Sequence, residues 1–128
     1  MNLESRVVKT QKNPQELYEF LTQVENFKKL MPEDTKFELQ GEDKFLFGLK
    51  GMPEIALGIK EKNPYSQVVL GSTSDKLAFT LTCNIIEAGE GSEAQLIFDG
   101  DFNAMMAMMI KGPIKKFLEQ LASGLEKL

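Results

Sequence analysis

Hydrophobic positions follow two different periods along the 128-residue chain. Between residues 13 and 32 they recur every three or four positions, which predicts helices. From residue 37 to residue 102 they alternate with polar positions, which predicts strands. After residue 103 the helical period returns. The pattern therefore predicts one α+β domain over residues 1–128, with the helices on one face of an antiparallel sheet.

The first helical region has a strong start signal. Asn13 occupies the N-cap position, Pro14 the first helical position and Glu16 the third, which is the order that favours a helix start. The apolar residues that follow fall on one stripe, formed by Leu17, Phe20, Leu21 and Val24. A second, short helix carries Phe27, Leu30 and Met31, and Pro32 ends it.

Seven strands are predicted. The first covers residues 3–10, where the alternation is imperfect. The other six follow one another with short polar connections, so they form an antiparallel meander. Their alternating apolar positions are Phe37 and Leu39; Phe45, Phe47 and Leu49; Ile55, Leu57 and Ile59; Val68 and Leu70; Leu77, Phe79, Leu81, Cys83 and Ile85; and Leu96, Phe98 and Phe102.

The last helix, residues 104–128, has an unusual composition. Its predicted N-cap is Asn103. Its first turns hold four of the seven methionines, at positions 105, 106, 108 and 109, and methionine suits surfaces that must adapt in shape. Gly112-Pro113 predicts a bend or a break, because Pro113 has no N–H to donate to the carbonyl of Met109. We interpret this helix as an adaptable cover over an apolar space.

A curved sheet that faces this helix leaves a gap, which large side chains or a ligand must fill. Each side chain there also suits a plain hydrophobic core, and that alternative stays open. The collective arrangement resembles a mostly apolar ligand pocket. The predicted ligand-binding residues are Phe45, Phe47, Leu57, Phe79, Leu81, Phe98, Phe102, Met106, Met109, Ile110 and Phe117.

The composition excludes several kinds of catalytic site. The chain has no histidine, which removes Ser-His-Asp and Cys-His arrangements and the commonest zinc and iron sites. Its single cysteine, Cys83, lies in an apolar strand row and is predicted to be buried. The chain has no phosphate-binding glycine motif. No catalytic residue, metal site or cofactor is predicted.

Two carboxylates stand at strand spacing, Asp99 and Asp101. The alternation places both on the outer, solvated face of the sheet. A bulge near Gly100 would instead turn one of them inward, where it could bind a metal or act as an acid or base. The candidate polar groups of a ligand pocket are Tyr18, Tyr65, Thr80, Thr82 and Asn84, although the alternation places the last three on the outer face.

Charge and targeting signals limit the partners. The formal net charge is −4 and Arg6 is the one arginine, which argues against nucleic acid. The C-terminal helix is locally basic, with four lysines against two glutamates. This is either a solvated face or a patch that meets anionic headgroups or an acidic partner. The lone cysteine and the lack of an apolar leader or membrane-length segment predict a cytoplasmic protein.

The segment from Asn13 to Leu21, followed by Val24 to Pro32, resembles the start of the SRPBCC superfamily, which contains START, Bet v 1-like and polyketide cyclase domains. The resemblance implies a helix-grip fold: a seven-stranded antiparallel sheet wrapped around the C-terminal helix, with two small helices after the first strand. It also implies that lipids, sterols or polyketide-like molecules bind between sheet and helix. It supplies no family-wide catalytic residue.

Three functions follow from these patterns. The first is binding of an apolar small molecule without catalysis. The second is a polyketide cyclase-like enzyme that uses a buried tyrosine or aspartate as general acid or base. The third is an interaction module, a monomer or homodimer whose methionines cover a partner surface.

Overall fold

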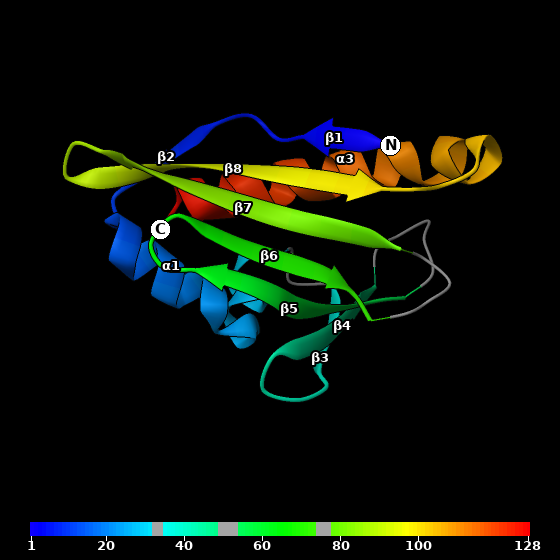
Figure 1. Cartoon of the computed structure of the whole chain (residues 1–128), viewed down its shortest axis with the longest axis horizontal. Helices are drawn as coiled ribbons and strands as arrows, with labels where there is room; N and C mark the ends of the chain where they lie inside the picture. The colour runs from blue at the N-terminus through cyan, green and yellow to red at the C-terminus, as the bar shows by residue number, and fades with distance from the viewer. Residues whose placement is uncertain (32–34, 49–53, 74–77) are drawn as a thin grey trace.

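The computed structural model describes residues 1–31, 35–48, 54–73 and 78–128. In these residues an antiparallel sheet of eight strands lies against a long C-terminal helix (Figure 1). The strands are β1 (Asn2–Glu4), β2 (Val8–Thr10), β3 (Lys36–Leu39), β4 (Lys44–Gly48), β5 (Ile55–Asn63), β6 (Gln67–Ser72), β7 (Phe79–Ala88) and β8 (Gly91–Gly100). The helices are α1 (Pro14–Thr22), the 3-10 turn η1 (Val24–Asn26), α2 (Phe27–Leu30) and α3 (Ala104–Glu126). The predicted α+β, helix-grip architecture is confirmed.

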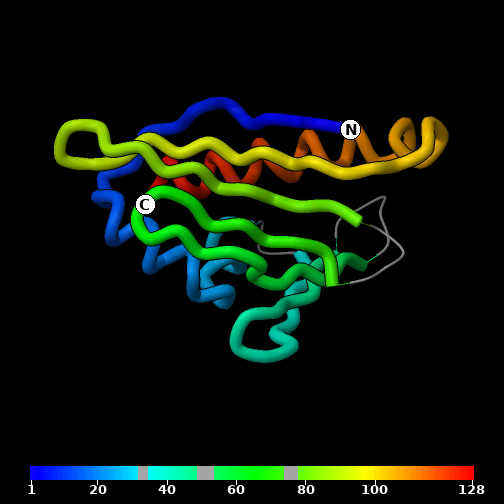
Figure 2. The backbone as a smooth tube through the Cα atoms, in the orientation of Figure 1, coloured from blue at the N-terminus to red at the C-terminus, as the bar shows by residue number. Residues whose placement is uncertain are grey.

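The strands from β3 to β8 form the predicted meander, in which each strand pairs antiparallel with the next. The order across the sheet is β1-β8-β7-β6-β5-β4-β3, and β2 also pairs with β8. Figure 2 shows how the first and last parts of the chain meet at the β8 side of the sheet, where α3 runs back along the strands. Three of the predicted positions, Pro32, Leu49 and Leu77, lie outside the described residues.

The predicted first strand, residues 3–10, is in fact divided into β1 and β2, so the sheet has eight described strands instead of seven. Glu4 pairs with Ile97 and Val8 pairs with Ala94. Between these two pairs the N-terminal segment advances by four residues, whereas β8 advances by only three. The one extra residue in the N-terminal segment forms a β-bulge. At this point the buried Ser5 hydroxyl accepts a hydrogen bond of 2.9 Å from the Leu96 N–H.

Asn13 starts α1 as the sequence predicts. Its side-chain oxygen accepts a hydrogen bond of 2.9 Å from the Glu16 N–H, and its own N–H donates to the Glu16 carboxylate at 3.2 Å. This reciprocal pair satisfies two of the N–H groups that a helix start leaves without partners. The cap directs the buried side chains of Leu17 and Leu21 into the core.

Asn103 starts α3, because its side-chain oxygen accepts a hydrogen bond of 2.8 Å from the Met106 N–H. The helix is unbroken across Gly112 and Pro113, and the predicted bend there stays a prediction. Its buried face follows the helical period over Ile110, Ile114, Phe117, Leu118, Leu121, Ala122 and Leu125. In Figure 1 the first turns of α3 extend beyond the end of β8, so the sheet covers only the later part of the helix.

Candidate functional site

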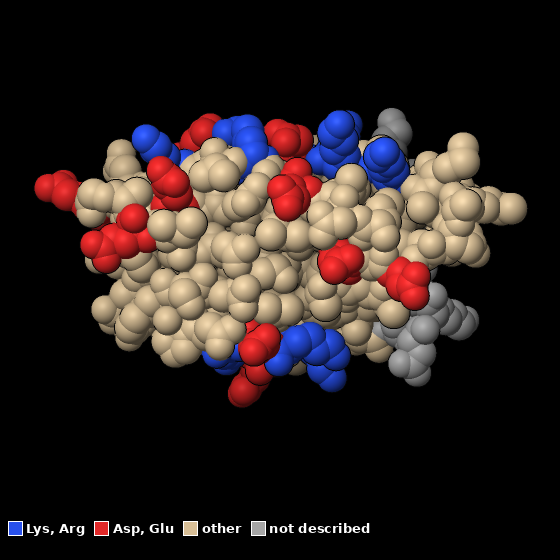
Figure 3. Space-filling model, turned by 45° about the horizontal axis from the view of Figure 1, so that its top comes forward, with Lys and Arg blue, Asp and Glu red and all other residues tan. Residues whose placement is uncertain are grey.

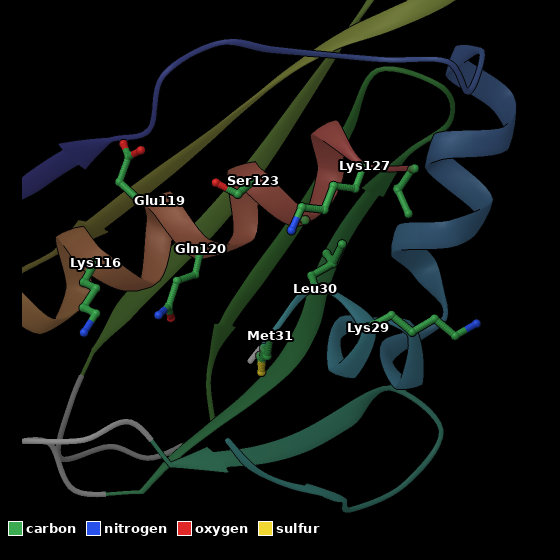
Figure 4. A pocket seen from close by; sticks show the side chains of 10 residues that line it. Lys29, Leu30, Met31, Lys116, Glu119, Gln120, Ser123 and Lys127 are labelled. Atoms are coloured by element: carbon green, nitrogen blue, oxygen red, sulfur yellow. The ribbon is translucent and has the colours of Figure 1, made fainter. Parts of the chain in front are cut away.

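A cleft of about 540 Å³ lies between α2 and the second half of α3 (Figure 4). Its apolar wall comes from the buried side chains of Leu30 and Met31. Pockets of roughly 300 to 1,000 Å³ are the usual size for small-molecule sites. The complete lining is Lys29, Leu30, Met31, Lys116, Glu119, Gln120, Ser123, Gly124, Lys127 and Leu128. The cleft borders the C-terminal helix, but it faces α2 and not the sheet, and none of the predicted ligand-binding residues lines it.

The α3 wall of the cleft is a polar stripe. Lys116, Gln120, Gly124 and Lys127 are spaced by four, four and three positions, so they share one helix face. Figure 4 shows the side chains of Gln120 and Lys127 extending from α3 into the cleft, whereas Lys29 turns away from it along α2. Basic side chains thus stand at both ends of the stripe.

Gly124 is the point where the two helices come closest. A Cβ added there would lie 2.9 Å from the Leu30 Cα and 3.0 Å from the Leu30 carbonyl oxygen. Contacts that short do not occur between real side chains and backbone, so only glycine fits without moving α2. Both residues line the cleft, so this contact joins its two walls.

Arg6 forms ion pairs with both acidic side chains of α3. Its Nη1 lies 2.7 Å from a Glu126 carboxylate oxygen, and its Nε lies 3.5 Å from a Glu119 carboxylate oxygen. The hydrogen bond between Arg6 and Glu126 raises the pKa of the guanidinium and lowers the pKa of the carboxyl. Arg6 also donates to the Ser123 hydroxyl at 3.2 Å.

The predicted ligand-binding residues form two aromatic groups. In the first, Phe45 is 5.9 Å from Phe47, which is 4.8 Å from Phe117 of α3, centroid to centroid. In the second, Phe98 is 5.0 Å from Phe79 and 6.2 Å from Phe102. Leu57, Leu81 and Ile110 are buried in the same core, and Phe102 and Met106 are half-buried against it. Ten of the eleven residues therefore pack into one apolar interior.

Met109 is the exception. It is 67% exposed, so the prediction that it faces the aromatic rows is wrong. The physical reason is that the first turns of α3 extend beyond the sheet (Figure 1), where a helical period alone does not decide which face is covered. Met105 and Met108 are also exposed, by 74% and 82%. Figure 3 shows that the tip of the molecule where α3 begins carries no described charged side chain on the face in view.

The other candidate polar groups stay apart from the cleft. Asp99, Asp101 and Thr80 are exposed, as the strand alternation predicts. Tyr65 is 50% exposed, and its ring packs edge-on against the half-buried Tyr18 at 5.6 Å. The half-buried Asn84 on β7 accepts a hydrogen bond from the Gln67 amide on the neighbouring strand β6. Thr82, also on β7, is half-buried.

Cys83 is buried as predicted, and burial raises the pKa of its thiol to about 12. Within the described residues no group of three or more potential metal-ligating side chains comes together. None of the helices in the described part of the chain is long and apolar enough to cross a membrane.

The patterns in the sequence do not identify the cleft. They place Leu30 and Met31 on a short helix and assign these two residues no functional role. They also do not distinguish Gln120, Ser123 and Gly124 from the neighbouring residues of the C-terminal helix. The lysines of the C-terminal helix stand out only as a basic face. The sequence shows the helical spacing of the polar stripe on α3, but it does not show that α2 faces this stripe. The same patterns miss two further members of the aromatic stack, Phe27 and Phe37, whose rings lie 5.3 and 5.1 Å from Phe45.

Comparison with known proteins identifies the fold. No family model and no curated protein matches the chain in sequence. Among solved structures, a START superfamily protein from Mycobacterium smegmatis is similar over 98% of this chain and 94% of its own, with a TM-score of 0.74 and 12% identity. The Aha1 dimer from Colwellia psychrerythraea is similar over 98% and 96%, with a TM-score of 0.63 and 13% identity. A protein from Thermus thermophilus is similar over 99% and 95%, with a TM-score of 0.74 and 13% identity. This chain has the helix-grip fold of the START and SRPBCC group.

Proposed function

We propose that this helix-grip chain binds an apolar small molecule, of the lipid, sterol or polyketide class, between α3 and the rest of the domain. The α2–α3 cleft carries the proposal, because it is a concavity of about 540 Å³ beside the helix that this fold grips. Its buried wall of Leu30 and Met31 offers apolar contact, and its rim offers a few polar groups. That combination is typical of small-molecule sites.

Three of the predicted ligand-binding residues, Phe45, Phe47 and Phe117, form the apolar layer behind the cleft in this proposal. Phe117 belongs to α3 and Phe27 to α2, and a stack through Phe45 and Phe47 connects the two rings. The rings on the inner faces of the two cleft-forming helices therefore belong to one apolar layer. A ligand that inserts beyond Leu30 would contact these stacked rings only if α2 and α3 first moved apart.

The test is a binding titration with 1-decanol, an uncharged apolar probe, followed by isothermal calorimetry. Gln120→Trp places a large ring in the cleft, and we expect it to abolish the binding that the unmodified chain shows. Lys115→Trp is the matched control, because Lys115 is exposed on the same helix outside the cleft lining. Binding that survives Gln120→Trp unchanged, or no binding to the unmodified chain, contradicts the proposal.

A second function, a homodimer, is favoured by one observation. Met105, Met108 and Met109 are 74%, 82% and 67% exposed, and such apolar patches mark interaction surfaces. A structural neighbour is described as a dimer. Light scattering after size-exclusion chromatography tests this function. Dimers that dissociate when the three methionines become serine, and persist in Ile86→Ser, support it, whereas a monomer at all concentrations refutes it.

A further inference from the structure

The charge on the cleft is the opposite of the charge on the chain as a whole. The chain has a formal net charge of −4, but the α3 wall of the cleft has a lysine at each end, Lys116 and Lys127. The one carboxylate side chain that lines the cleft, Glu119, is already paired with Arg6 at 3.5 Å. The charged side chains that line the cleft, three lysines and one glutamate, therefore carry a net positive charge.

These lysines have no ion-pair or hydrogen-bond partner among the side chains of the described residues. Both are exposed at the rim, so their side chains are free to move toward a ligand. In Figure 4 the ammonium end of Lys127 lies on the cleft side of α3. A lysine side chain supplies three N–H donors and no acceptor, which suits an anionic oxygen.

Gln120 is the third polar group at this place. It lies one helical turn from Lys116, is half-buried, and extends into the cleft (Figure 4). Its amide makes no hydrogen bond with the described part of the chain, unlike the amides of Asn63 and Gln67, which are paired at 2.9 Å. A half-buried amide without a protein partner is available to a ligand oxygen. The polar groups thus converge beside an apolar wall.

We propose that the cleft selects an amphipathic anion, a molecule with one aliphatic chain and one carboxylate. The carboxylate pairs with Lys116 and Lys127 and accepts a hydrogen bond from the Gln120 amide, while the chain packs on Leu30 and Met31. This inference rests on the proposed function, because it names the ligand class of the same cleft.

The test compares decanoate with 1-decanol, which has the same chain length and no charge, by calorimetry at low salt. Each exposed ion pair strengthens binding by roughly 1.4- to 5-fold, so we expect decanoate to bind several-fold more tightly than decanol. Near 1 M NaCl the screening length falls to about 3 Å, and the preference should shrink. Equal binding of the two probes at low salt overturns the inference and leaves the proposed function standing, whereas binding of neither contradicts both.

Charge variants locate the preference. Lys116→Gln with Lys127→Gln should make decanoate and decanol bind alike. Lys111→Gln with Lys115→Gln removes the same charge from the same helix outside the cleft lining, and it should retain the preference. A preference that disappears equally in both double variants overturns the inference, because the helix as a whole would then attract the anion. Inorganic phosphate that binds as tightly as decanoate also overturns it, because the apolar chain would contribute nothing.

Discussion

Replacement of Gly124 by alanine tests the contact that joins the two walls of the cleft. The new Cβ would lie 2.9 Å from the Leu30 Cα, 3.0 Å from its carbonyl oxygen and 3.1 Å from its Cβ. Two of these atoms are backbone, so α2 as a whole must move away. Overpacking of this kind costs about 1 to 3 kcal/mol. Alanine returns about 1 kcal/mol through its higher helix propensity. The net expectation for Gly124→Ala is a loss of roughly 0 to 2 kcal/mol in the free energy of unfolding.

Gly112 offers the matched control on the same helix. A Cβ there meets nothing within 4 Å apart from its chain neighbours, so Gly112→Ala gains helix propensity without overpacking. Its gain is at most about 1 kcal/mol, because a residue before proline is disfavoured in the helical region. Urea unfolding measures both variants, with the unmodified chain as reference. If the Gly124→Ala variant has the same free energy of unfolding as the Gly112→Ala variant, the close approach of α2 and α3 is refuted, and with it the shape of the cleft.

Three further predictions concern stability and reactivity. Asn13→Ala removes the cap of α1 and should lower the free energy of unfolding by about 0.5 to 2 kcal/mol; an unchanged urea midpoint would contradict the cap. Arg6→Gln should destabilise the chain at neutral pH. The Glu126 pKa is lowered in the folded state, so the pair stabilises above the unfolded pKa and its contribution disappears as the pH falls through the folded value. A difference in melting temperature from the unmodified chain that persists unchanged at about pH 3 would contradict this sign. The Cys83 thiol, with a pKa of about 12 and full burial, should resist a disulfide-forming labelling reagent at about pH 8 until the chain unfolds; fast labelling of the folded protein would disprove its burial.

Features that depend on a few neighbouring residues were predictable from the sequence. The capping pair of Asn13 and Glu16 and the cap of α3 at Asn103 are local interactions, so the residue types alone specify them. Alternation placed Asp99 and Asp101 on the exposed face because the strand period is two. The order of elements then followed from the change between the two periods.

Features that depend on distant partners were not predictable. The division of the first strand at Ser5 requires the Leu96 N–H, 91 positions away. The cleft requires Gly124 to meet Leu30, and neither residue carries a local signal for the other. The exposure of Met109 depends on how far α3 extends beyond the sheet (Figure 1), which a helical period does not encode.

Amide chemical shifts of the isotope-labelled chain during titration with decanoate test the central claim most directly, because they report where a ligand binds. Binding in the α2–α3 cleft predicts the largest shifts at Leu30, Met31 and the α3 turns from Lys116 to Lys127. Shifts confined to the exposed methionines at the start of α3, or no shifts at saturating decanoate, would contradict it.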